Sequence, residues 1–191
     1  MFDRCTWHNP PPVHMLAGDT LRVVTADRTD FWRVTQYGFI RDNGHFFGTA
    51  VDGGFTAQVR VRAAFSALYD QAGLMVRIDE RRWLKAGVEF SDGEPLLSTV
   101  LTNELSDWTV APAPAFEDGF WLRVTVDGGV LRVQYSADGI TWPMLRLAPF
   151  PQAPRYLVGP MCCTPDRAGL EVTFSDFMVG PALGRDLHDL S

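Results

Sequence analysis

Cysteine and histidine are scarce in this sequence, and their scarcity limits the chemistry that the chain can carry. It has three cysteines and four histidines among 191 residues. Cys162 and Cys163 are neighbours, too tightly tethered to bridge each other, so we expect no disulfide framework. No histidine has the spacing of a zinc site, and no glycine-rich phosphate loop or serine elbow occurs. We therefore expect no metal and no cofactor.

Clustered positive charge and long apolar runs are also missing. The formal net charge is −6 and the pI is about 5.1, which disfavours binding to a phosphate backbone or to an anionic lipid surface. No segment is long and apolar enough for a membrane span or for the core of a signal peptide. We expect a protein of the reducing cytoplasm with no nucleic-acid partner and no membrane partner.

Aromatic residues, glycine and proline are abundant, and apolar residues alternate with polar ones. Aromatic side chains make up 12% of the chain, beside 17 glycines and 13 prolines. Alternation with a period of two predicts half-buried strands. It is clearest in Leu21–Thr25, Phe55–Val61 and Leu122–Val126, and similar runs cover Ala72–Ile78, Trp83–Phe90, Leu97–Thr102, Leu131–Tyr135, Tyr156–Gly159 and Leu170–Phe177. Helical periodicity is limited to a short turn near Ala64–Leu68.

Turn signals separate these strands at short spacing. Residues that tolerate positive φ occur in Asp42–Gly44, Asp52–Gly54, Ser91–Gly93, Asp127–Gly129 and Ala137–Gly139. A series of antiparallel strands without crossover helices predicts an all-β, antiparallel two-sheet β-sandwich, with a jelly roll as the favoured topology. We expect one domain over residues 1–180 and a loose tail over 181–191, with Pro10–Pro12 and Ala111–Pro114 as extended surface connections.

Two of the predicted strands present a polar face on the side away from the core. Alternation directs the even-numbered residues of 71–78 and 83–90 inward, and the odd-numbered residues to the opposite face. That face would carry Gln71, Met75, Arg77, Trp83, Lys85 and Glu89. It combines an amide, an acid, two bases and an aromatic ring, while Gly73 and Gly87 would leave a shallow groove. This mixture suits a polyhydroxylated ligand.

Pairing of these two runs as a hairpin restricts their register. A shared face requires an odd number of loop residues, and three residues among 79–82 satisfy this. One such register opposes Gln71 to Glu89 and Met75 to Lys85. The neighbouring register opposes the like charges of Arg77 and Lys85, which costs free energy. Two interpretations of the face remain open: a ligand site, or a solvated sheet surface whose charges pair for solubility.

Further aromatic residues are candidates for a ligand platform. Asp107 and Trp108 lie together in what reads as a loop or strand end, where Trp108 would either stack on a sugar ring or plug one end of the sandwich. The segments Thr29–Trp32 and Tyr37–Gly38 would add an aromatic wall or belong to the core. By contrast, the hairpin Ser136–Trp142 resembles a shortened Asp-box, in which the aspartate of the turn is architectural.

Four segments carry a resemblance to a known family: Asp70–Arg77, Trp83–Glu89, Ser106–Trp108 and Tyr135–Trp142. From about Trp7 to Phe177 the chain resembles the regulator-of-enolase-type family of domains of unknown function, whose members look like concanavalin A-like lectin/glucanase sandwiches. The resemblance implies this fold, and analogy with the wider fold implies carbohydrate binding. The glucanase signature of alternating acids, Glu-x-Asp-x-Glu, is absent. The resemblance therefore favours lectin-like binding over hydrolysis.

Three functions are compatible with these observations. The first is a lectin-like, non-catalytic module that binds a carbohydrate, a small polyol or a sugar-like metabolite through Gln71, Arg77, Trp83, Lys85, Glu89, Asp107 and Trp108. The second is a glycan-active hydrolase in which Glu89 works with Asp70 or Asp107, although Glu89 beside a base would stay ionised, the wrong state for a general acid. The third is a regulatory module of central carbon metabolism that binds a protein partner through an exposed sheet face.

Overall fold

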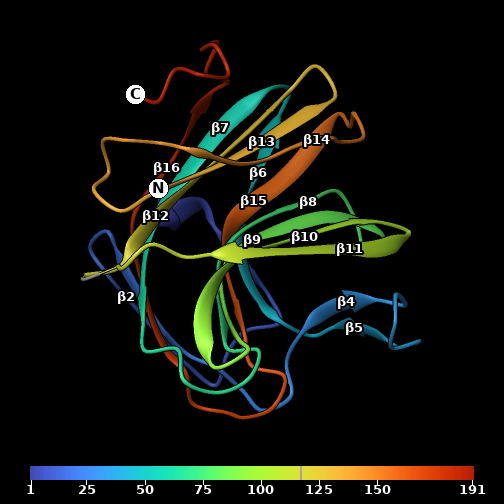
Figure 1. Ribbon diagram of the computed structural model, residues 1–191, viewed down its shortest axis with the longest axis vertical. Helices are drawn as coiled ribbons and strands as arrows, with labels where there is room; N and C mark the ends of the chain where they lie inside the picture. Colours follow the sequence, from blue (N-terminus) through green and yellow to red (C-terminus); the bar gives the residue numbers. More distant parts are fainter. Residues whose placement is uncertain (117) are drawn as a thin grey trace.

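The computed structural model describes residues 1–116 and 118–191, which form two stacked antiparallel sheets (Figure 1). Sheet A has seven strands in the spatial order β1 (Thr6–His8), β6 (His45–Asp52), β15 (Arg155–Cys163), β8 (Gln71–Arg77), β9 (Arg82–Ser91), β10 (Glu94–Asn103) and β11 (Leu105–Pro112). Sheet B has seven in the order β14 (Met144–Pro149), β13 (Val130–Ser136), β12 (Phe120–Asp127), β7 (Phe55–Ala63), β16 (Glu171–Pro181), β3 (Thr20–Val24) and β2 (Val13–Ala17). The predicted two-sheet sandwich of jelly-roll, concanavalin A-like type is confirmed.

Two short elements lie outside these sheets. The hairpin of β4 (Phe31–Arg33) and β5 (Ile40–Asp42) stands apart beside β9–β11 in Figure 1, and η1 (Phe2–Arg4) is a single 3-10 turn. Of the residues that the structure describes, none belongs to a helix long and apolar enough to cross a membrane.

The core lies between the two sheets, where inward residues of both meet in one buried cluster. Leu74 and Ala86 of sheet A and Val59 and Leu122 of sheet B belong to it, and all four are almost inaccessible to water. A fully buried leucine or valine stabilises the fold by about 1.5–3 kcal/mol. Each alternating run predicted from the sequence overlaps one of the strands that supply this cluster or its margins.

The predicted turns lie at strand junctions. Between β9 and β10, Asp92 and Gly93 adopt positive φ of 56° and 88°, the left-handed conformation that a tight hairpin requires. Between β13 and β14, Asp138 Oδ1 accepts the amides of Ile140 and Thr141, each over 2.8 Å. The architectural interpretation of Asp138 is confirmed.

Two local expectations are modified by the structure. The short turn expected near Ala64–Leu68 lies at residues 67–70, where the Asp70 amide donates to the Ala67 carbonyl oxygen over 3.0 Å and the Asp70 carboxylate accepts the Ser66 and Ala67 amides. The segment 111–114 is not wholly a surface connection, since its first two residues complete β11. Residues 182–191 form no strand and lie mostly at the surface, where the Leu190 carbonyl oxygen accepts the Trp142 amide over 2.8 Å.

Candidate functional site

The β8–β9 hairpin adopts the register without the like-charge contact. Gln71 pairs with Glu89, and Met75 pairs with Lys85. Beyond β8 the Ile78 amide still donates to the Arg82 carbonyl oxygen over 2.9 Å, so three residues, 79–81, close the loop as expected. The odd-numbered side chains of both strands therefore share one face of sheet A, the face that points away from sheet B. We call it the outer face of sheet A.

The outer face of sheet A is buried, although it lies outside the sandwich core. Lys85 and Glu89 are each 3% exposed, and Gln71 is 5% exposed. Hairpin β4–β5 and the segment before it cover this face, and Phe31 shares a second buried cluster with Trp83. A solvated sheet surface is therefore the wrong interpretation, because the charged groups have been removed from water.

A buried ion pair neutralises Lys85. Its Nζ atom lies 2.9 Å from Asp30 Oδ1, which also accepts the Phe31 amide over 2.7 Å. Burial acts to lower the pKa of Lys85, but the surrounding acids, Asp30 first among them, outweigh burial and raise the pKa above its ordinary value. Lys85 thus stays charged and ties β9 to the segment that leads into β4.

Glu89 has a neutral hydrogen-bond partner instead of an ion pair. Its Oε2 atom accepts from Ser98 Oγ over 2.8 Å, and Ser98 Oγ accepts from Trp108 Nε1 over 3.2 Å. Burial raises the pKa of Glu89, and nearby Lys85 offsets this only in part. The net shift of the Glu89 pKa is upward, because desolvation outweighs the attraction of the base. Neither of these partners of the Glu89 network, Ser98 or Trp108, carries a charge.

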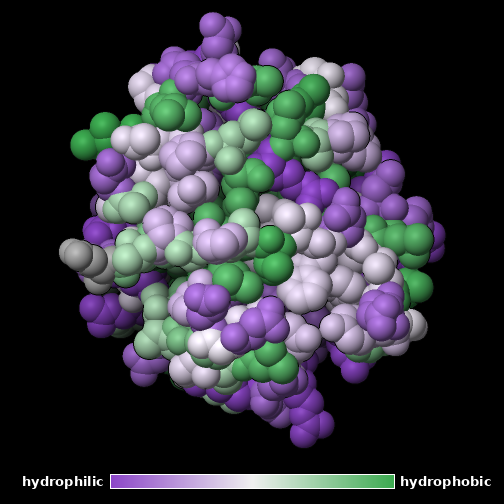
Figure 2. All heavy atoms as spheres, viewed as in Figure 1, coloured by the Kyte–Doolittle hydropathy of each residue, from purple (hydrophilic) through white to green (hydrophobic). Residues whose placement is uncertain are grey.

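A pocket of about 300 Å³ opens above these groups. Four of the seven residues predicted for the site line it: Gln71, Lys85, Glu89 and Trp108. The other lining residues come mainly from hairpin β4–β5 and from loops: Arg28, Asp30, Trp32, Tyr37, Phe39, Arg41, Tyr69, Val100, Pro165 and Asp166. Figure 2 shows hydrophobic, intermediate and hydrophilic residues side by side over the face in view.

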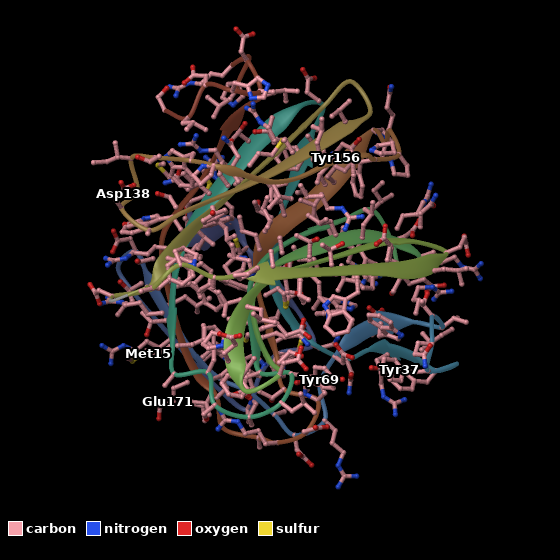
Figure 3. All side chains as sticks on the ribbon, in the orientation of Figure 1. Met15, Tyr37, Tyr69, Asp138, Tyr156 and Glu171 are labelled. Atoms are coloured by element: carbon pink, nitrogen blue, oxygen red, sulfur yellow. The ribbon has the colours of Figure 1, made fainter. Side chains whose placement is uncertain are left out.

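Four aromatic side chains follow one another around the pocket. The Trp108 ring centroid lies 6.4 Å from those of Trp32 and Tyr69, at interplanar angles of 87° and 73°. Trp32 lies 5.6 Å from Tyr37 at 66°. The Tyr37 and Tyr69 hydroxyl oxygens are 3.2 Å apart, and this hydrogen bond, with burial, raises the pKa of Tyr69 to about 12. Figure 3 labels both tyrosines on the same side of the molecule. We call these four residues the aromatic cage.

Three of the predicted site residues lie outside the pocket. Arg77 forms a bidentate pair with Asp42, over 2.7 and 2.8 Å. Trp83 is buried and offers no platform to a ligand. Asp107 lies on the other side of β11 from its neighbour in sequence, where it pairs with Arg146 over 2.7 Å. Successive residues of a strand point to opposite faces, so the two neighbours could not share a site.

The carboxylates named for hydrolysis do not meet in the pocket. Asp70 is fully buried, and both of its oxygens accept from Arg167. Neither Asp70 nor Asp107 lines the pocket that Glu89 lines. The acid pair predicted from the sequence is therefore not assembled there, and hydrolysis through that pair loses its structural basis.

Gly73 and Gly87 do not form the predicted groove. They face each other across β8 and β9, and a Cβ atom on Gly73 would lie 1.9 Å from the Ala86 carbonyl oxygen. The two backbones approach each other too closely for a side chain, so glycine here serves strand pairing. The pocket lies instead toward β10, β11 and hairpin β4–β5.

Sequence reasoning missed part of the site. Ser98 lies opposite Gly87, so the same alternation, carried across to β10, would have placed it on the outer face. Asp30 carries no such signal, because it precedes β4 in an irregular segment. The two alternatives for Thr29–Trp32 are both realised: Phe31 is fully buried, whereas Trp32 lines the pocket.

An antiparallel two-sheet sandwich with an aromatic pocket on one outer sheet face defines a β-sandwich domain of the concanavalin A-like type. The chain belongs to the DUF1349 family, described as a protein of unknown function, whose family model matches residues 7–182. The family resemblance noted in the sequence is confirmed.

Three known proteins are similar to this chain to different degrees. Regulation of enolase protein 1 of Saccharomyces cerevisiae is 55% identical over 186 residues, 97% of this chain and 94% of the relative. The crystal structure of a functionally unknown protein from Saccharomyces cerevisiae has a TM-score of 0.94 and 54% identity, over 96% of this chain and 99% of that chain. An engineered GH43 glycoside hydrolase with endo-xylanase and exo-arabinofuranosidase activity has a TM-score of 0.68 and 16% identity, over 94% of this chain and 38% of that chain. This last likeness concerns the fold alone.

Proposed function

We propose that this domain is a non-catalytic binding module that holds a carbohydrate or a sugar-like metabolite in the pocket on the outer face of sheet A. One observation carries the proposal: the pocket of about 300 Å³ brings aromatic rings together with buried polar groups. Small-molecule sites combine apolar walls with a few placed polar groups. A sugar matches both, since its C–H surface packs on rings and its hydroxyls need hydrogen-bond partners.

Trp108 is the stacking platform in this proposal. Its side chain is 37% exposed at the pocket, and its indole Nε1 is held by Ser98. The hydrogen bond fixes the orientation of the indole without covering either face of the ring. A platform fixed in advance loses little conformational entropy when a ligand binds.

Gln71 and Glu89 supply the polar contacts. They are directly opposed in the β8–β9 register. Gln71 Oε1 accepts from Cys163 Sγ over 3.5 Å, which leaves the amide nitrogen of Gln71 as a donor on the residue opposite Glu89. A donor next to an acceptor suits two adjacent hydroxyl groups, each of which can donate and accept.

The fold likeness to a GH43 glycoside hydrolase supports this proposal by analogy. Unrelated functions share folds, so the analogy carries less weight than the pocket.

Titration with a panel of mono- and oligosaccharides, followed by calorimetry, tests the proposal. We expect at least one neutral sugar or polyol to bind, and Trp108→Ala to weaken its binding about tenfold or more. Trp121→Ala is the matched control, because Trp121 is a half-buried tryptophan of sheet B whose indole donates to Asp176. Absence of binding across the panel, or binding that Trp108→Ala leaves unchanged, would contradict the proposal.

Regulation of a protein partner is a second candidate function, suggested by the name of the yeast relative. Exposed apolar side chains near the pocket favour it: Tyr37 and Ile40 of hairpin β4–β5, and Val110 of the adjoining β11. Sedimentation of the chain mixed with enolase tests this candidate. We expect a complex that the double variant Ile40→Ser, Val110→Ser abolishes, and the absence of any complex would eliminate the candidate.

A further inference from the structure

We propose that the ligand of this pocket carries a positive charge, as a hydroxylated amine or an N-methylated ammonium does. The inference rests on the binding function proposed above and narrows its ligand class. The aromatic cage stands beside a buried carboxylate, Glu89, that has no cationic hydrogen-bond partner among the described residues.

Each of the four side chains of the aromatic cage contacts two others. Trp108 contacts Trp32 and Tyr69, Trp32 also contacts Tyr37, and the hydroxyl groups of Tyr37 and Tyr69 are hydrogen-bonded to each other. In the three ring pairs Trp32–Tyr37, Trp32–Trp108 and Tyr69–Trp108, the planes of the two rings are inclined to each other at 66–87°. The four rings therefore line the same pocket from different directions. The face of an aromatic ring carries negative potential, and such cages recognise quaternary ammonium groups.

No cationic side chain of the described residues fills the aromatic cage. The guanidinium groups that lie over rings contact Phe39, Trp121 and Trp142, none of which belongs to the cage. Lys85, the buried base of the pocket, is committed to Asp30. The cage is thus available to a cation from outside the chain.

The buried floor of the pocket has more acids than bases. Lys85 and Asp30 cancel each other, whereas Glu89 is bonded to the neutral Ser98. Ionised Glu89 therefore leaves one unit of negative charge on a residue that is only 3% exposed. Burial raises the pKa of Glu89, so an unpartnered carboxylate there costs free energy that a ligand cation would offset.

Acidic and basic side chains both lie at the mouth of the pocket, and they do not cancel the negative charge of its floor. Arg28 is exposed, and its Nε atom lies 3.1 Å from Asp27 Oδ2. The Arg41 guanidinium lies 4.9 Å from the centre of the Phe39 ring, and Asp166 faces the same opening. Charges in contact with bulk water are screened far more strongly than the buried floor.

The test compares two polyols that share a hexitol chain and differ in charge, N-methylglucamine and sorbitol. Each is titrated calorimetrically into the full chain at neutral pH. We expect N-methylglucamine to bind about tenfold more tightly or better. The preference should fall to within about threefold in Glu89→Gln and should persist in Glu94→Gln, an exposed acid at the start of β10.

The outcomes separate this inference from the function on which it rests. Equal binding of the two polyols, or a preference for sorbitol, would overturn the charge and leave the binding function standing. Failure of both these polyols and of every sugar to bind would overturn both. If Glu89→Gln does not fold, Trp108→Leu replaces it, since leucine keeps an apolar wall without an aromatic face. Trp108→Leu should then remove the preference, and a preference that persists would count against the cage.

Discussion

Lys85 Nζ and Asp30 Oδ1 lie 2.9 Å apart although 55 residues separate them in the chain. Their contact fastens the segment before hairpin β4–β5 to the outer face of sheet A. Both side chains are largely buried, and buried charges destabilise a fold unless they are paired. This ion pair therefore acts beside the Arg77–Asp42 pair in holding hairpin β4–β5, which supplies Trp32 and Tyr37 to the pocket, against sheet A.

Asp30→Asn removes one charge of this pair and leaves Lys85 buried without its partner. We expect a loss of about 3–5 kcal/mol in the free energy of unfolding, measured by urea denaturation. Adding Lys85→Met should restore much of the loss, because no charge then remains buried. Asp52→Asn is the control: its pair with Arg155 is exposed, and the midpoint should hardly move. A small effect of Asp30→Asn would show that Lys85 does not need this partner.

Gly73→Ala should destabilise the chain severely. The added Cβ atom would lie 1.9 Å from the Ala86 carbonyl oxygen, and backbone cannot move aside as a flexible side chain can. We expect a loss of about 3 kcal/mol or more in chemical denaturation. Gly180→Ala provides the comparison, because no atom lies within 4 Å of its new Cβ. Similar stabilities of the two variants would argue against the close backbone approach of β8 and β9.

Val34 adopts a positive φ of 63° in the loop of hairpin β4–β5, a conformation that is costly for a β-branched residue. Glycine relieves this cost, so Val34→Gly should be less destabilising than Val110→Gly by about 1 kcal/mol or more. The two valines are equally exposed, at 38%, and Val110 lies in a regular strand. Thermal or urea unfolding of the two variants measures the difference. Equal losses of unfolding free energy in Val34→Gly and Val110→Gly would mean that the loop is unstrained at Val34.

His45 makes stability depend on pH. Its Nε2 atom accepts the Ala26 amide over 3.0 Å, and its Nδ1 atom lies 2.8 Å from the Asn9 carbonyl oxygen. Burial lowers the pKa of His45 below its ordinary value. The unfolded chain therefore takes up a proton first, and stability present above about pH 6.5 is lost as the pH falls toward the folded pKa.

Urea denaturation at several pH values measures this dependence. His45→Gln should flatten the fall in stability between neutral and mildly acidic pH, while His14→Gln, on the exposed strand β2, should keep it. If the pH dependence of the unfolding free energy is the same in His45→Gln as in the unaltered chain, groups other than His45 cause it.

Alternation predicted the β8–β9 hairpin because one face of each strand packs into the core. Period two alone placed Gln71, Lys85 and Glu89 on the same side, and the like-charge contact disfavoured the wrong register. Alternation fails where apolar side chains occupy both faces of a strand or where neither face packs into the core. Near its start β6 has the adjacent buried residues Phe46 and Phe47, and β2 is exposed at all five residues, so neither strand shows the pattern.

The rest of the site depends on contacts between distant parts of the chain. The Arg33 amide donates to Ser106 Oγ across 73 residues, and such a contact leaves no local pattern in the sequence. This contact helps to place hairpin β4–β5 over the outer face of sheet A, where the hairpin shields the charged side chains from water. Asp107 was misplaced for another reason: its segment reads as a loop, where neighbours can share a side, but it forms a strand, where they cannot.

The most direct test of the ligand site follows the indole N–H signals of the six tryptophans in a two-dimensional NMR spectrum during titration with N-methylglucamine. The indole of Trp108 donates to Ser98 Oγ, and that of Trp32 donates to the Thr35 carbonyl oxygen. A ligand in the aromatic cage should shift these two signals in a saturable way and leave those of Trp121 and Trp142 in place. Signals that do not move, or that all move alike, would contradict a ligand site in this pocket.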